Sequence, residues 1–142
     1  MTKAEAFDLA SVDTIAACNK PFDMELVHPV SRVGLGVFFS LVGKDSDIYR
    51  ARVRAMADSR LRGAKDDDSL DKLEAKNIDA IVAANVAWWT VVDGKKLDGI
   101  VTLGGEKLDF TPANQRTVFT KILPAREQAQ EAINDLGNFM RG

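Results

Sequence analysis

The sequence predicts a single α+β domain: an N-terminal β-hairpin followed by about four helices, with a second short hairpin inserted. Three observations predict this class. A run of β-branched and aromatic residues ends near residue 42, apolar residues recur at helical spacing after residue 49, and a Gly-Gly pair separates two short apolar segments. A length of 142 residues suits one domain, which we place over residues 1–142.

Composition and charge narrow the class of protein. Apolar residues make up 46% of the chain and charged residues 28%, which are ordinary fractions for a globular protein. The net charge of −2 gives no global positive field to attract nucleic acid or an anionic membrane. No apolar run approaches the roughly 20 residues that span a bilayer, and acidic residues interrupt the N-terminus before a signal core forms. We therefore expect a cytoplasmic protein.

The N-terminal third predicts a short helical turn around residues 12–18 and then a hairpin. Its strands are predicted at 24–27 and 36–42, with His28-Pro29 and Ser31-Arg32 in the connecting turn.

The second of these strands is apolar on both sides. Because side chains alternate along a strand, Val37, Phe39 and Leu41 share one face, while Phe38 and Val42 lie on the other. Helices or another copy of the chain must cover at least one of these faces.

An arginine-rich amphipathic helix is predicted next. Residues 43–46 end the strand and supply a capping serine, Ser46. The apolar positions then recur at i, i+4, i+7, i+8 and i+12: Tyr49, Val53, Met56, Ala57 and Leu61. The other sides carry Arg50, Arg52, Arg54, Arg60 and Arg62.

A flexible charged loop is predicted at residues 63–69, because a glycine begins it and three consecutive acidic residues follow. Ser69 can cap a second helix, which we expect to extend through Trp88 and Trp89 and to close at a turn over residues 91–94. Its apolar surface is broad, which indicates burial on more than one side.

The C-terminal third predicts the second hairpin and two more helices. Residues 99–103 and 106–110 flank Gly104-Gly105, a pair that suits a two-residue turn. Thr111-Pro112 is a strong helix start, and Pro124 begins a last helix. The apolar stripe of that last helix is Ala129, Ala132, Ile133, Leu136 and Met140.

No residue pattern predicts catalysis, a metal site or a cofactor. His28 and Cys18 are the only histidine and cysteine, and a turn histidine with a small buried thiol explains them better than a nucleophile–base pair. Three consecutive acids, Asp66 to Asp68, lack the alternating ligand positions of a calcium loop. Gly104-Gly105 lacks the spacing of a phosphate-binding loop. We therefore expect a protein that is not an enzyme.

Two features suggest contacts with a partner. The arginines can form a solvated or salt-bridged face, with an acidic protein or nucleic acid as the weaker interpretations; Arg50 and Arg54 are the candidates. On a helix, the adjacent residues Trp88 and Trp89 would diverge by roughly 100°, so one can pack in the core while the other reaches an interface. Core packing of both is the alternative, and Phe38 completes the candidate set.

Several motifs occur in an order that resembles one known family. A strand ends in Gly43-Lys44-Asp45-Ser46-Asp47-Ile48-Tyr49, and an arginine-rich helix and a charged loop follow it. The chain continues with Ala87-Trp88-Trp89, a Gly-Glu-x-Leu turn at residues 105–108, Phe110-Thr111-Pro112-Ala113-Asn114, Arg126-Glu127-Gln128 and Asn138-Phe139. This series, over about residues 25–140, is similar to the tail assembly chaperones of long-tailed bacteriophages and prophages. The segment 95–103 is longer than that pattern leads us to expect.

The resemblance implies a function without catalysis or cofactors. Chaperones of this family are thought to coat the long helical tape measure protein in the host cytoplasm until tail tube subunits displace them. It therefore implies three contacts: with the tape measure protein, with the tail tube protein, and between copies of the chaperone itself.

Two other classes of function remain open. A structural tail or head-tail connector protein would stay in the virion and would be found in purified particles. A small nucleic-acid-binding regulator would use the arginine helix and would bind in a salt-dependent manner, although the net charge of −2 argues against it.

Overall fold

A computed structural model describes residues 6–61 and 70–140 and has the predicted α+β class. The predicted charged loop at 63–69, its Asp66 to Asp68 and the capping Ser69 lie outside the described residues. The helices are η1 (Leu9–Val12), α1 (Thr14–Cys18), α2 (Asp47–Leu61), α3 (Leu70–Ala84), α4 (Pro112–Lys121), α5 (Leu123–Asn134) and η2 (Leu136–Asn138). The strands are β1 (Phe22–Val27), β2 (Gly34–Leu41), β3 (Asn85–Val92), β4 (Lys95–Asp98), β5 (Ile100–Leu103) and β6 (Glu106–Asp109).

The larger sheet has four antiparallel strands in the order β1-β2-β3-β4. The predicted N-terminal hairpin is confirmed as β1 and β2, with Met24 opposite Phe39 and Glu25 opposite Phe38. Strand β2 begins earlier than predicted, at Gly34, and it passes close to β3 at Gly36. Here φ is +73° and a Cβ atom would lie 2.8 Å from the carbonyl oxygen of Val91, so only glycine fits without strain.

The prediction that Trp88 and Trp89 end a helix is wrong, because α3 ends at Ala84 and both tryptophans lie on β3. The sequence of β3, NVAWWTVV, is rich in β-branched and aromatic residues, which favour a strand. Asp93 and Gly94 both have positive φ and form the two-residue turn into β4. The turn expected over 91–94 thus closes a strand, and the segment 95–103 forms β4 and β5.

The predicted second hairpin is confirmed as β5 and β6, which pair around the Gly104-Gly105 turn. Thr111 caps α4 as predicted, since its hydroxyl accepts a hydrogen bond from the amide of Asn114 at 3.1 Å. The last helix is shorter than predicted. It ends at Asn134, and Asp135 then caps the 3₁₀ turn η2 by accepting from the amide of Gly137 at 2.9 Å. Leu136 and Met140 are therefore not part of α5.

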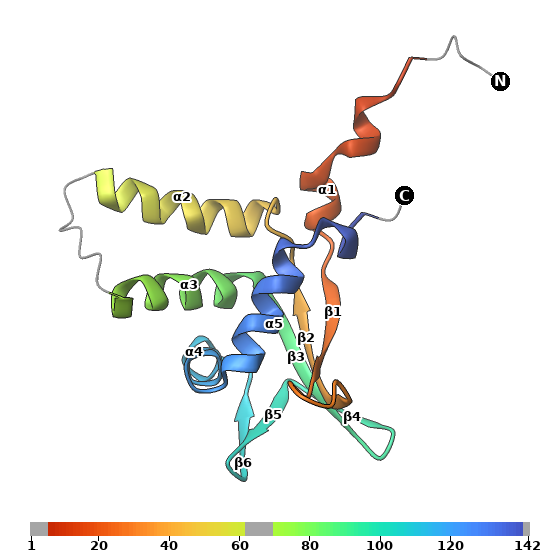
Figure 1. Cartoon of the computed structure of the whole chain (residues 1–142), viewed down its shortest axis with the longest axis vertical. Coiled ribbons are helices and arrows are strands. Elements are labelled where there is room, and N and C mark those ends of the chain that lie inside the picture. The colour runs from red at the N-terminus through yellow and green to blue at the C-terminus, as the bar shows by residue number, and fades with distance from the viewer. Residues whose placement is uncertain (1–5, 62–69, 141–142) are drawn as a thin grey trace.

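The core lies between the sheet and the C-terminal helices (Figure 1). Phe39 on β2 packs against Phe119 of α4, with ring centroids 5.4 Å apart, and both are almost fully buried. Helix α5 contacts β1 and β2, and α3 leads directly into β3. One face of the four-stranded sheet is therefore covered by helices, as its apolar side chains require.

Helices α2 and α3 form an antiparallel pair that projects from the sheet (Figure 1). Ser46 caps α2 as predicted: its hydroxyl accepts from the amide of Tyr49 at 3.2 Å. The stripe predicted on α2 is only partly covered, since Tyr49 is half-buried and Val53 is 46% exposed.

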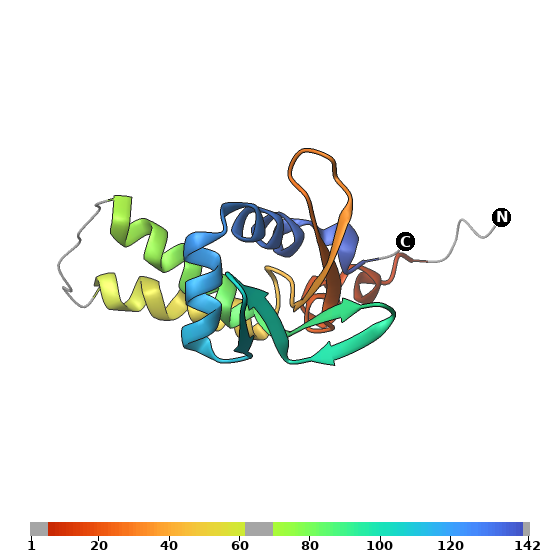
Figure 2. The same cartoon turned by 90° about the horizontal axis from the view of Figure 1, so that it is seen from below.

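The N-terminal segment 6–18, here called the N-terminal arm, leads away from the rest of the molecule (Figures 1 and 2). Its short helical turns η1 and α1 are each capped by an aspartate, Asp8 and Asp13. Among the described residues, no helix is long and apolar enough to cross a membrane.

Candidate partner-binding surface

The two faces of the four-stranded sheet differ in what covers them. Side chains alternate along each strand, so Phe39 and Trp88 point into the core while Phe38 and Trp89 point the other way. In Figure 2, α4 and α5 lie on one side of β3 and β4, and no described element lies on the other. We call the apolar side chains of this second face the outer strip: Phe38, Ala87, Trp89 and Val91.

Phe38 and Trp89 form the centre of the outer strip. They are cross-strand partners in the β2–β3 register, and their rings stack with centroids 5.5 Å apart and an interplanar angle of 5°. Both side chains are only half-buried. Aromatic pairs of this kind add attraction beyond the area that they bury, so the stack is a rigid apolar platform.

Charged side chains surround this platform. Glu25 lies opposite Phe38 in the register, and Asp98 lies opposite Trp89. The ammonium of Lys96 lies 4.4 Å from the centroid of the Trp89 ring and 3.2 Å from a carboxylate oxygen of Asp98. An apolar centre with a polar rim is the usual composition of a protein–protein interface.

Trp88 has a structural role. It is 1% exposed, its indole N–H donates to the carbonyl oxygen of Gly99 at 3.0 Å, and its ring packs edge-on against Phe110. One tryptophan is thus in the core and the other outside it, because they alternate on a strand rather than diverge on a helix.

The candidate arginines lie on α2, apart from the outer strip. Arg50 and Arg54 line an open groove, the α2 groove, with four other residues: Lys44, Tyr49, Val53 and Ala57. Within the described residues, neither Arg50 nor Arg54 forms an ion pair. Arg52 does, since it reaches Asp79 of α3 at 3.3 Å. The arginine face is therefore partly solvated, at Arg50 and Arg54, and partly salt-bridged, at Arg52, which agrees with the predicted solvated or salt-bridged face.

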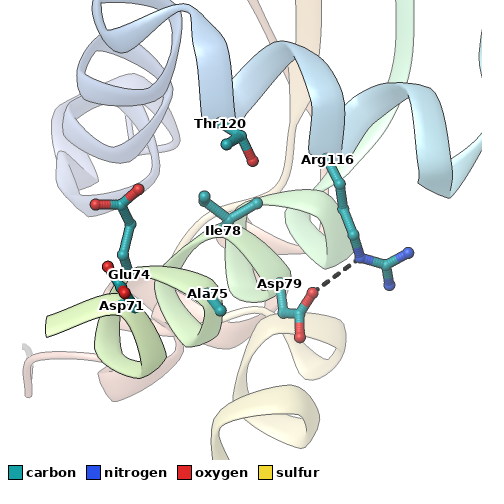
Figure 3. A pocket seen from close by; sticks show the side chains of 7 residues that line it. All are labelled: Asp71, Glu74, Ala75, Ile78, Asp79, Arg116 and Thr120. Atoms are coloured by element: carbon teal, nitrogen blue, oxygen red, sulfur yellow. Dashed lines mark hydrogen bonds and ion pairs between the residues drawn. The ribbon is translucent and has the colours of Figure 1, made fainter. Parts of the chain in front are cut away.

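A second groove, between α3 and α4, holds paired charges (Figure 3). Asp79 accepts from Arg116 at 3.0 Å through one carboxylate oxygen and from Arg52 at 3.3 Å through the other. Glu74 pairs with Arg126 at 3.5 Å. These carboxylates join α2, α4 and α5 to α3, which is a structural role.

The residues considered for chemistry are not brought together. Cys18 precedes β1 and His28 follows it, so the six-residue strand separates them by about 20 Å. Cys18 is fully buried, which raises the pKa of its thiol. The Nδ1 atom of His28 accepts hydrogen bonds from the amides of Val30 and Ser31 in the hairpin loop. The described residues contain no cluster of three metal-ligating side chains.

Comparison of the chain with protein-family models, curated proteins and solved structures found no match.

The sequence indicates Phe38 and Trp89 individually, but not that they are stacked partners. The sequence does hold a signal for the strand itself: β-branched and aromatic residues at 85–92 are followed by Asp93-Gly94, a hairpin pattern that pairs this segment with the strand after it.

Proposed function

We propose that this protein is a non-enzymatic phage tail assembly chaperone that binds the tape measure protein in the host cytoplasm and assists polymerisation of the tail tube. The observation that carries the proposal is the stacked Phe38–Trp89 platform on a sheet face that no described helix covers. The resemblance of the motifs between residues 25 and 140 supplies the class of partner.

A long amphipathic helix is a suitable partner for this surface. Such a helix binds by placing large apolar side chains at i, i+3, i+4 and i+7 against an apolar surface. The outer strip offers two aromatic rings side by side, with small Ala87 and branched Val91 along the same strand. The charged rim of Glu25, Lys96 and Asp98 can orient the helix through its polar side chains.

The small size of the outer strip suits a reversible contact. A chaperone that tail tube subunits displace must bind each stretch of the rod weakly and release it intact. A surface with two aromatic anchors provides a few kcal/mol from its central residues, and many copies along one rod add their contributions.

The test measures binding of a tape measure fragment to three purified variants. Truncating an interface anchor costs about 2 kcal/mol, so Trp89→Ala is expected to raise Kd roughly thirtyfold while the free energy of unfolding falls by only about 1 kcal/mol. Phe38→Ala is also expected to raise the Kd for the tape measure fragment. Val30→Ala is the matched control, because Val30 is 85% exposed in the hairpin loop, outside the strip. Unchanged binding by both strip variants would contradict the proposal.

A further inference from the structure

The N-terminal arm exposes apolar side chains that its own molecule leaves uncovered. Phe7 is 70% exposed, Leu9 77% and Val12 52%. Leu9 and Val12 are three residues apart within the 3₁₀ turn η1, so they lie on the same side of it. An ordered segment that presents an apolar side to water is typical of a surface that binds another protein.

The base of the arm is fixed next to the start of α2. The amide of Gly43 donates to the carbonyl oxygen of Cys18 at 2.9 Å, and Asn19 and Asp47 exchange two hydrogen bonds of 2.8 Å. From this anchor the arm leads away from the body, while α2 runs in the opposite direction (Figures 1 and 2). The arm therefore does not lie along the α2 groove of its own molecule.

The α2 groove complements the arm in polarity and in charge. Val53, Ala57 and the half-buried ring of Tyr49 form its apolar part. Its charged residues are all basic, namely Lys44, Arg50 and Arg54, and the two arginines form no ion pair within the described residues.

The described part of the arm carries the opposite charge. Asp8 and Asp13 are its only charged residues, and they flank the apolar turn η1. A carboxylate that accepts a capping hydrogen bond through one oxygen still has the other oxygen free to meet an arginine.

We propose that the N-terminal arm of one copy docks in the α2 groove of a second copy. The contact joins two different surfaces, so the arm of each copy can bind a second copy while its α2 groove binds the arm of a third. Such a heterologous contact continues from copy to copy and produces an open row or a closed ring. This association is independent of the outer strip. If the proposed function also holds, a row of chaperones presents successive strips to one rod.

Sedimentation equilibrium of the full-length protein tests the association. We expect the mean mass to rise with concentration, and the dissociation constant to increase at least tenfold in Leu9→Ser/Val12→Ser and in Arg50→Ser/Arg54→Ser. Val30→Ser and Leu123→Ser are matched controls, since both residues are exposed and lie outside the arm and the groove; these two variants should associate normally. A protein that stays monomeric up to about 100 μM, or that associates equally well in all variants, overturns the proposal.

Crosslinking tests where the arm docks. Mixing Leu9→Cys with Val53→Cys and adding a short bis-maleimide should give a heterodimer, because docking brings the two cysteines together. The native Cys18 is buried and should not react. Mixing Leu9→Cys with Leu123→Cys is the control and should give much less. Equal yields from the two mixtures would assign the arm another docking site and overturn the proposal. Tape measure binding measured on the same variants separates this outcome from failure of the proposed function.

Discussion

At the scale of single residues, Trp88 and Trp89 are neighbours in sequence with opposite surroundings. Strand alternation places the first against Phe39, Phe110 and the carbonyl of Gly99, and the second against Phe38 and Lys96. The two substitutions to alanine should therefore have different effects on folding and binding.

Trp88→Ala is expected to lower the free energy of unfolding by about 3–5 kcal/mol, because it leaves a large cavity in the core. Trp89→Ala should cost about 1 kcal/mol, the order of an aromatic pair on a half-exposed face. Urea unfolding of the two variants measures both values. Equal losses of stability would show that the two faces of the sheet are equally buried.

Cys18 gives the stability a dependence on pH. Its burial raises the pKa of the thiol above the ordinary value of 9.0, so the folded protein holds the proton more tightly than the unfolded chain. This contribution is fully present below pH 9 and is lost as pH rises through the higher, folded pKa. The stability of the wild type relative to Cys18→Ala should therefore fall above about pH 9 in urea titrations. A difference that stays constant from about pH 7 to pH 10 would mean that Cys18 titrates equally in both states.

At the scale of elements, Asp79 joins three helices. It lies on α3 and accepts hydrogen bonds from Arg52 of α2 and Arg116 of α4. Helix α2 otherwise packs mainly along α3, so this carboxylate contributes to holding the projecting helix pair together.

Asp79→Asn is expected to destabilise the protein by about 1 kcal/mol, since both ion pairs are partly exposed to solvent. Amide hydrogen exchange in α2 should become faster than in the wild type, because the remaining contacts with α3 open more often. Asp98→Asn is the control, because its pair with Lys96 joins residues of a single strand. Unchanged exchange in α2 would mean that apolar contacts alone hold the pair.

The elements that the sequence predicted well have strong local signals. The first hairpin follows from β-branched and aromatic residues, the second from Gly104-Gly105, and α4 from Thr111-Pro112. Each of these signals depends only on residues that are close in sequence. Periodicity predicts a helix where β3 lies, because the apolar spacing of α3 continues into β3 on both sides of Asn85. Its β-branched and aromatic residues and its pairing with β2 and β4 decide the conformation, and such long-range contacts override local periodicity.

The candidate surface was predictable only as separate residues. Phe38 stood out because its strand is apolar on both faces, and Trp89 because it adjoins another tryptophan. Their stacking depends on the β2–β3 register, which no local pattern contains. Arg50 and Arg54 lie on another element, so the predicted set divides into the outer strip, a core residue and the α2 groove.

At the scale of the whole molecule, the proposed binding surfaces lie on different elements. The outer strip is on β2 and β3, and the α2 groove is on α2. The N-terminal arm extends from one end of the molecule, and the α2–α3 tip lies at the other end (Figure 1). Under the two proposals, one copy holds a rod through its sheet while its arm and its groove contact neighbouring copies.

The most direct measurement uses Trp89 as the only tryptophan. In a Trp88→Phe variant that is shown by circular dichroism to be folded, a tape measure fragment without tryptophan is titrated while emission and iodide quenching are recorded. We expect the emission of Trp89 to shift to shorter wavelength and its quenching to fall as the fragment binds, because the ring leaves water for an apolar contact. Binding that leaves both the emission and the quenching of Trp89 unchanged would contradict the proposal that this face of the sheet holds the partner.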